Sequence, residues 1–395
     1  MPIPPLFSYY LSRLENPVFE GHPTWNKPLP LTRKHWAAVL RENDGDFITI
    51  GDYFHAARMF FEKRGMDMIA SALRKRFRQD IQPADIEHIS IVLVKHGEFY
   101  HPARIEARAH EKQMLFVLNV AISRAGKAHI RGEYDFLRNL NRAFPCTYLP
   151  RVYGYGDVNI HGTHKAAMFI GEWFNNYYEF HISRDAVDKK NKIIVWDTKR
   201  GNYLLSAGQS LDLYTQAAGI LTSYYNLESF EQINAWHHAA GDFVVHLKNQ
   251  KVDLKLITVR QYASKFKNLD DRKNTESDAE LILQALLVFF LNLSIKMRLD
   301  RLDGVGDIVW ADNFAVQGTL IGFLNALGAK ANVSALPDSA LRCFFYYLSE
   351  CSKSDLRELS EAILATFNPN APESDVIKQH LSSHIDTLHR CIHQL

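Results

Sequence analysis

The chain of 395 residues is poor in cysteine, and its four cysteines form no pattern that would bind a metal or build a disulfide framework. They stand at Cys146, Cys343, Cys351 and Cys391, at none of the spacings typical of zinc or iron–sulfur ligands. Disulfides are therefore not expected. Such sparse cysteine use favours a reducing, cytoplasmic setting.

An excess of charge of one sign is also lacking. Lysine and arginine number 46 against 44 aspartate and glutamate residues, which leaves a formal net charge of +2. A field strong enough to attract nucleic acid or a membrane surface is not expected, so neither is predicted as a partner. The densest basic run, residues 74–78, is interpreted as the exposed face of a helix.

Long apolar runs are missing as well. The most apolar segment, residues 281–295, is shorter than the roughly 20 residues that span a bilayer, and it contains Gln284 and Asn292. We expect it to be a buried central helix. The N-terminus has neither a basic start nor a long apolar core, so no signal peptide is predicted. With 47% hydrophobic residues, the chain can form two or three packed units.

The N-terminal part, residues 1–85, is rich in proline at its start and then predicts two helices. Asp52 is a candidate cap for the first helix, and residues 66–77 predict the second. This part is therefore expected to be an N-terminal helical extension.

From residue 86 the hydrophobic period changes to that of strands. Three successive antiparallel strands are predicted, then one helix, then two more strands, over residues 89–95, 103–108, 114–122, 128–141, 151–156 and 165–173. The remainder is predicted to be largely helical, over residues 211–225, 281–295, 312–328, 338–350, 353–367 and 375–393.

The segment Trp236–Tyr262 carries the strongest functional signal. Gly241 and Asp242 open a short apolar strand at residues 243–245, and a second strand follows at residues 252–259. Together they predict a hairpin with an acid at its mouth. A carboxylate so placed can act as a base close to a bound metal.

The order of these elements resembles the protein-kinase-like fold, and within it the aminoglycoside-phosphotransferase-like branch of small-molecule kinases. The resemblance runs from about Ile86 to Leu327 and depends on order and spacing more than on motifs. It implies an α+β protein of two lobes. An antiparallel five-stranded lobe with one helix would occupy residues 86–173 and a helical lobe residues 174–395, after the helical extension of residues 1–85.

The resemblance also implies a nucleotide site. The family's phosphate-binding lysine corresponds to Asn119, and its partner glutamate corresponds to Glu133. The connector between the lobes, whose backbone would meet an adenine ring, corresponds to Glu172, Trp173 and Phe174.

The catalytic base of the family corresponds to Asp242, but its two metal ligands have no counterpart. The metal-binding asparagine corresponds to Leu247, and the metal-binding aspartate corresponds to Thr258. Phosphoryl transfer depends on positioning and on neutralising the triphosphate with magnesium. ATP and magnesium are the cofactors that the resemblance implies. The residues at Asn119, Leu247 and Thr258 disfavour them, and we predict no metal ligand.

Other residues could compensate for these changes. Lys95 or Lys127 could supply the missing positive charge, and Arg260 could bind a phosphate with both of its terminal nitrogens. Asn249 could coordinate a metal if the hairpin were reshaped.

An aromatic run follows the predicted connector, at Trp173, Phe174, Tyr177, Tyr178 and Phe180. Packing in the core or at the hinge between the lobes is the first interpretation. A wall on which a ligand stacks is the second.

Three functions are compatible with these observations. The favoured one is a catalytically degenerate, pseudokinase-like protein that binds a small molecule or a protein partner in the cleft between its lobes. The second is an atypical but active ATP-dependent phosphotransferase that acts on a small molecule, with Asp242 as the base. The third is an interaction scaffold whose cleft is filled by side chains. The sequence does not specify an oligomeric state.

Overall fold

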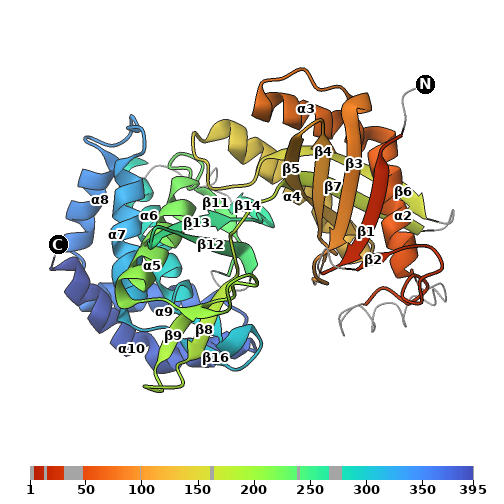
Figure 1. Ribbon diagram of the computed structural model, residues 1–395. Coiled ribbons are helices and arrows are strands. Elements are labelled where there is room, and N and C mark those ends of the chain that lie inside the picture. The colour runs from red at the N-terminus through yellow and green to blue at the C-terminus, as the bar shows by residue number, and fades with distance from the viewer. Residues whose placement is uncertain are drawn as a thin grey trace. The chain divides into compact units, whose positions relative to one another are not determined.

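The computed structural model is a mixed α+β protein, and it describes residues 4–12, 16–30, 48–97, 99–160, 164–237, 241–266 and 278–394 (Figure 1). The chain divides into two compact units. Unit 1 consists of Met1–Asn141 and Pro150–Asn175, and unit 2 consists of Arg142–Leu149 and Asn176–Leu395.

Unit 1 is built on a seven-stranded sheet with the strand order β2-β1-β3-β4-β5-β7-β6. The five strands predicted from residue 86 onward are present and antiparallel, with the helix α4 (Arg124–Ala143) between the third and the fourth. They are β3 (Ile86–Leu93), β4 (Ala103–Ala109), β5 (Lys112–Ala121), β6 (Val152–Ile160) and β7 (His164–Glu172).

The N-terminal part of unit 1 is not purely helical, which corrects our expectation for residues 1–85. The strand β1 (Leu6–Leu11) runs parallel to β3, and β2 (Pro17–Val18) pairs with β1 at the edge of the sheet. The register joins Leu6 to His88. A partner so distant in the sequence leaves no local signal, and β1 has no alternation of buried and exposed residues.

Two helices complete this part as predicted. They are α2 (Ile50–Phe60) and α3 (Met66–Phe77), joined by the π-helical turn η1 (Phe61–Gly65), and a short 3₁₀ turn, η2 (Pro83–Asp85), leads into β3. The cap of α2 is Thr49 and not Asp52. Asp52 completes the capping box, because its carboxylate accepts a hydrogen bond from the Thr49 backbone N–H at 2.8 Å.

The sheet of unit 1 is covered on both faces. Phe116, Leu118 and Val120 of β5 belong to one core cluster with buried residues of α2 and α3. The residues between them point to the opposite face. There, the ring of Tyr134 from α4 lies 6.1 Å from the ring of Phe169.

The helices of unit 2 also lie where the hydrophobic pattern predicted them. They are α5 (Ala207–Ser223), α6 (Asp278–Lys296), α7 (Asn313–Gly328), α8 (Ala340–Ser349), α9 (Lys353–Ala365) and α10 (Pro372–Ile392).

Unit 2 contains more strand than a purely helical lobe would. The predicted hairpin is present as β12 (Phe243–Lys248) and β13 (Lys251–Leu256). The short strands that we did not predict are β8 (Phe180–Arg184), β9 (Asn191–Val195), β10 (Tyr203–Leu204), β11 (Glu231–Asn234), β14 (Gln261–Ser264), β15 (Leu299–Arg301) and β16 (Ile308–Trp310), with the 3₁₀ turn η5 (Leu302–Gly304).

Helix α6 extends at both ends beyond the apolar run at residues 281–295 from which it was predicted. It has 19 residues, and within the described part of the chain it is the one helix long and apolar enough to cross a membrane. Our judgement that this segment is too short is therefore corrected. Of its most apolar window, 61% is buried inside the structure. Helix α6 contacts α7, α8 and α9, which is the packing of a core helix.

Helices α5 and α7 pack closely because glycines face the contact. A Cβ atom on Gly322 would overlap the backbone carbonyl of Thr215, and one on Gly318 would lie 2.7 Å from Cβ of Tyr214. Backbone atoms cannot move aside as a flexible side chain can, so this contact depends on both glycines.

We predict that Gly322→Ala lowers the free energy of unfolding by about 2 kcal/mol, because it forces the two helices apart. Gly208→Ala in the first turn of α5 is the matched control, since no atom lies within 4 Å of a Cβ there. Urea unfolding monitored by circular dichroism measures both variants. Equal stability of the two variants would contradict the close approach of α5 and α7.

Candidate functional site

The predicted acid stands at the mouth of the hairpin. Asp242 directly precedes β12, and its backbone carbonyl accepts a hydrogen bond of 2.7 Å from the N–H of Ile257, which directly follows β13. At the other end, Asn249 and Gln250 form the turn with φ angles of 51° and 66°. Two positive φ angles are typical of the tight turns that close hairpins.

Both oxygens of the Asp242 carboxylate accept hydrogen bonds. Arg260 donates from Nη2 to Oδ1 at 2.5 Å and from Nη1 to Oδ2 at 2.6 Å. The backbone N–H of His237 also donates to Oδ2, at 2.9 Å. Only 1% of the Asp242 side chain is exposed, against 34% of the Arg260 side chain. The result is a bidentate ion pair whose acid is buried.

A short sheet brings these residues together. The strands β11 and β14 are antiparallel, and their register places Asn234 opposite Gln261. Ala235 directly follows β11 and Arg260 directly precedes β14. The pairing of the two strands therefore brings Ala235 and Arg260 close together. Arg260 donates a further hydrogen bond to the carbonyl of Ala235, at 3.0 Å.

Further cations surround the ion pair. Lys296 ends α6, and its ammonium lies 4.9 Å from the centre of the Trp236 ring. Burial lowers the pKa of Lys296 to about 8; the charge of Lys265 lowers it further, and that of Asp242 opposes the shift. Burial, followed by the charge of Lys296, also lowers the pKa of His237. We call Asp242, Arg260, His237 and Lys296 the Asp242 cluster.

The Asp242 cluster does not fit a magnesium ion. Its one carboxylate already binds a guanidinium, and its other charged group, Lys296, would repel a second cation. In the described ranges, no group of three or more His, Cys, Asp and Glu residues is arranged to hold a metal.

The two positions that correspond to metal ligands do not supply one. Leu247 lies within β12 opposite Val252, and Thr258 is half-buried just after β13. Asn249 is exposed in the hairpin turn, about 23 Å along the strand from Asp242 at roughly 3.3 Å per residue. In this hairpin, Asn249 therefore lies too far away to share a metal with Asp242.

The residues expected to bind the nucleotide phosphates lie in unit 1. Asn119 is half-buried on β5 opposite Phe169, on the face of the sheet that α4 covers. Glu133 is buried on α4, with 3% of its surface exposed. The structure thus places both residues on the same side of the sheet. Lys127, also on α4, is half-buried, and Lys95 is exposed after β3.

The expected connector residues also belong to unit 1. The backbone N–H of Glu172 donates to the carbonyl of Arg151 at 2.8 Å, and its carboxylate accepts from the Arg151 N–H at 3.3 Å. Trp173 and Phe174 are half-buried. A nucleotide site that combines these residues with Asp242 and Thr258 of unit 2 stays a prediction.

Part of the aromatic run has a packing role. Tyr178 exchanges two backbone hydrogen bonds of 2.9 Å with Val245 of β12, and the hydroxyl of Tyr177 donates to Asp253 of β13 at 2.9 Å. These two tyrosines bind the segment to the hairpin, in agreement with the interpretation of the aromatic run as packing residues.

Lys296 was not predicted as a site residue, and the role predicted for Arg260 was wrong. Lys296 is the one basic residue of α6, at the end of an otherwise apolar helix, and that isolated charge was a usable signal. Arg260 was considered only as a ligand for phosphate. In the structure its guanidinium binds Asp242.

No protein-family model matches the chain, and no curated protein matches its sequence. One similar solved structure is described as WaaP in complex with acyl carrier protein. The identity is 7%, and the alignment covers 74% of this chain and 84% of that chain, with a TM-score of 0.25. A likeness at that score supports no statement about the site. The kinase-like resemblance therefore depends on the order of the elements.

We predict that Arg260→Met lowers the free energy of unfolding by about 3 kcal/mol, because it leaves a buried carboxylate without its counter-ion. Asp242→Asn is expected to be milder, since Arg260 is one-third exposed and can reach water. The double variant should lose less than the sum of the two, and urea unfolding measures this coupling. Strictly additive losses would contradict a direct pair. The exposed pair Arg342–Asp338 is the matched control and should show little coupling.

The lowered pKa of Lys296 predicts a dependence of stability on pH. Between pH 8 and 10.5, the unfolded chain holds a proton on this lysine that the folded chain has lost, so stability rises with pH. Lys296→Met should reduce that rise and stabilise the protein at pH 7. Urea unfolding from pH 7 to 9.5 measures both effects.

Lys330 is the control, because burial also lowers its pKa to about 8. Its ammonium donates to the carbonyls of Ser223 and Tyr225 at 3.0 and 2.7 Å. Lys330→Met should reduce the same rise but destabilise the protein at pH 7, since two acceptors lose their donor. A pH profile of Lys296→Met identical to that of the unaltered protein would contradict the burial of its charge.

Proposed function

We propose that the chain is a catalytically degenerate, kinase-like protein that binds a ligand or partner and does not transfer phosphate. The observation that carries the proposal is the bidentate ion pair between Asp242 and Arg260. It occupies both oxygens of the residue that corresponds to the catalytic base.

A general base needs a free lone pair directed at the proton that it removes. In the Asp242 cluster, Oδ1 accepts from Arg260, and Oδ2 accepts from Arg260 and from the His237 N–H. These bonds leave one lone pair, on Oδ1, but the side chain is 1% exposed, so a substrate hydroxyl would have to displace the guanidinium to reach the carboxylate. Removing one partner of a buried pair costs several kcal/mol, so the paired state is strongly favoured.

The charge balance around Asp242 supports the same conclusion. An active phosphotransferase places anionic metal ligands here, so that magnesium can offset the triphosphate. Leu247 and Thr258 provide no such charge, and Arg260 and Lys296 add positive charge instead. The cluster therefore carries more positive than negative charge, and it is suited to an anionic group, a phosphate or a carboxylate, that binds beside the intact ion pair.

Thermal unfolding in the presence of ATP tests the proposal. We predict that ATP raises the melting temperature equally with magnesium and with EDTA, because the cations of the protein replace the metal. Asp242→Asn should retain or strengthen this shift, since it removes a negative charge that repels the anionic ligand. Asp338→Asn, at an exposed carboxylate elsewhere in unit 2, is the matched control.

Two outcomes would contradict the proposal. A magnesium-dependent shift that disappears in Asp242→Asn would favour the active phosphotransferase with Asp242 as the base. No shift under any condition would favour the interaction scaffold, which needs no nucleotide.

A further inference from the structure

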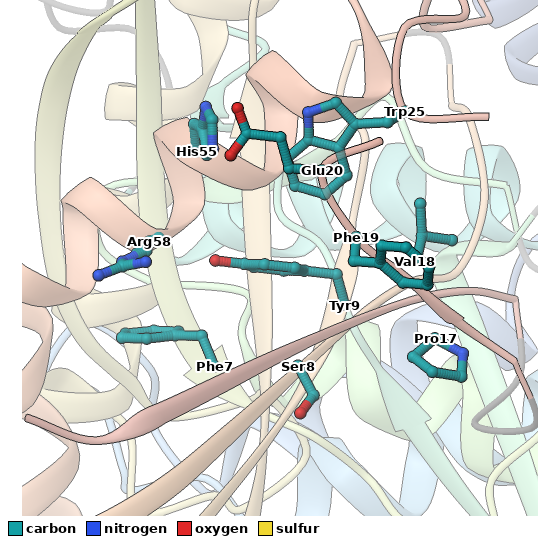
Figure 2. Close-up of a pocket in the computed structure, with 10 residues that line it drawn as sticks. All are labelled: Phe7, Ser8, Tyr9, Pro17, Val18, Phe19, Glu20, Trp25, His55 and Arg58. Atoms are coloured by element: carbon teal, nitrogen blue, oxygen red, sulfur yellow. The ribbon is translucent and has the colours of Figure 1, made fainter. Parts of the chain in front are cut away.

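Unit 1 contains a cavity of about 220 Å³ that is formed wholly by its N-terminal part (Figure 2). Its walls come from β1, from β2 and the turn that follows it, and from α2. Four of the ten residues that line it are aromatic, Phe7, Tyr9, Phe19 and Trp25, and the imidazole of His55 also lines it. The cavity lies in a different unit from the Asp242 cluster, so its function is independent of the one proposed above.

The indole of Trp25 lines the deep side of the cavity. It is 6% exposed, and it packs edge-on to Tyr9 with 5.6 Å between the ring centres. Gly51, in the first turn of α2, makes room for it, because a Cβ there would lie 2.6 Å from Cδ1 of Trp25. The rings of Phe54 and Trp25 are stacked at 6.0 Å, which holds the indole in place.

An exposed aromatic ring borders the cavity. Phe19 is 59% exposed, and it is among the few large apolar side chains of the described chain that face solvent. Tyr9, by contrast, is half-buried and packs against both Trp25 and Phe54. Rings from β1 and from the turn after β2 thus border one small space.

The two charged groups of the lining differ in their pairing. Arg58 forms an ion pair of 2.7 Å with Glu62, and its guanidinium lies 5.2 Å from the centre of the Phe7 ring. Glu20 is exposed and has no ion pair among the residues that the structure describes. Figure 2 shows the Glu20 carboxylate between His55 and Trp25, and Arg58 at the end beside Phe7. The charge of Arg58 is therefore offset, while no described basic side chain forms an ion pair with Glu20.

We propose that this pocket binds an alkylammonium group, held by the carboxylate of Glu20 and by the aromatic faces of Trp25, Tyr9 and Phe19. Aromatic rings attract cations through the negative charge on their faces, and recognition of ammonium groups by several rings is a recurrent use of that attraction. An anion would be repelled by Glu20 and would have to displace Glu62 from Arg58. A neutral apolar ligand would leave the carboxylate partly desolvated without a partner.

The test uses the full chain with 5-fluorotryptophan in place of tryptophan, followed by fluorine NMR. The chain has six tryptophans, and Trp25→Phe assigns the signal of the pocket. Tetramethylammonium chloride is the probe, and tert-butanol is its uncharged counterpart of similar shape. We expect a saturable shift of the Trp25 signal with tetramethylammonium, and none with tert-butanol or with sodium chloride at equal concentration.

Two variants make the result specific. Glu20→Gln should weaken the binding of tetramethylammonium about threefold or more, as expected for the loss of one exposed ionic contact. Glu87→Gln, at an exposed carboxylate of β3 outside the pocket, should bind it as the unaltered chain does. An equal shift with tert-butanol, undiminished binding in Glu20→Gln, or no shift of the Trp25 signal would each overturn the proposal.

Discussion

The ion pair between Asp242 and Arg260 is the interaction on which the rest of the site depends. A carboxylate with 1% exposure is stable only if a counter-ion or several donors replace its lost water. Arg260 and the His237 N–H together do so, and each belongs to a segment adjoining a different strand of the β11–β14 pair. The same contact that permits a buried acid here also occupies both of its oxygens. Stability requires that the buried carboxylate of Asp242 be paired, whereas phosphate transfer requires that it be accessible to a substrate hydroxyl. The ion pair with Arg260 satisfies the requirement of stability.

The hydrophobic pattern predicted the elements whose buried residues alternate along the chain. Strand β4 and helix α5 were recognised because one face of each is apolar, and β3 because most of its residues form an apolar run. The hairpin was recognised because a turn separates two apolar runs. Strand β1 escaped prediction because its residues are mostly half-buried, and its partner β3 is distant in the sequence. Tertiary pairing, and not local preference, makes it a strand.

In the candidate site, too, local features were predicted and contacts between distant segments were not. The sequence placed Asp242 at the hairpin mouth, since the Gly-Asp pair and the two strands are local features. It placed Arg260 near the position of a missing metal ligand, but the contact between the two charges depends on the pairing of β11 with β14. That pairing joins two very short strands that the whole hairpin separates in the sequence. Such short strands carry too little periodicity to be recognised.

A net charge of +2 conceals two local imbalances of opposite sign. In unit 2, Arg260 and Lys296 outnumber the single acid of the Asp242 cluster, and the depressed pKa of Lys296 reflects the free energy of keeping that excess buried. In unit 1, Glu20 adjoins an aromatic pocket in which the one arginine is already paired. A ligand is attracted by the charge that the protein leaves unbalanced, and not by the total. The two units should therefore prefer ligands of opposite charge, an anion for unit 2 and an ammonium group for unit 1.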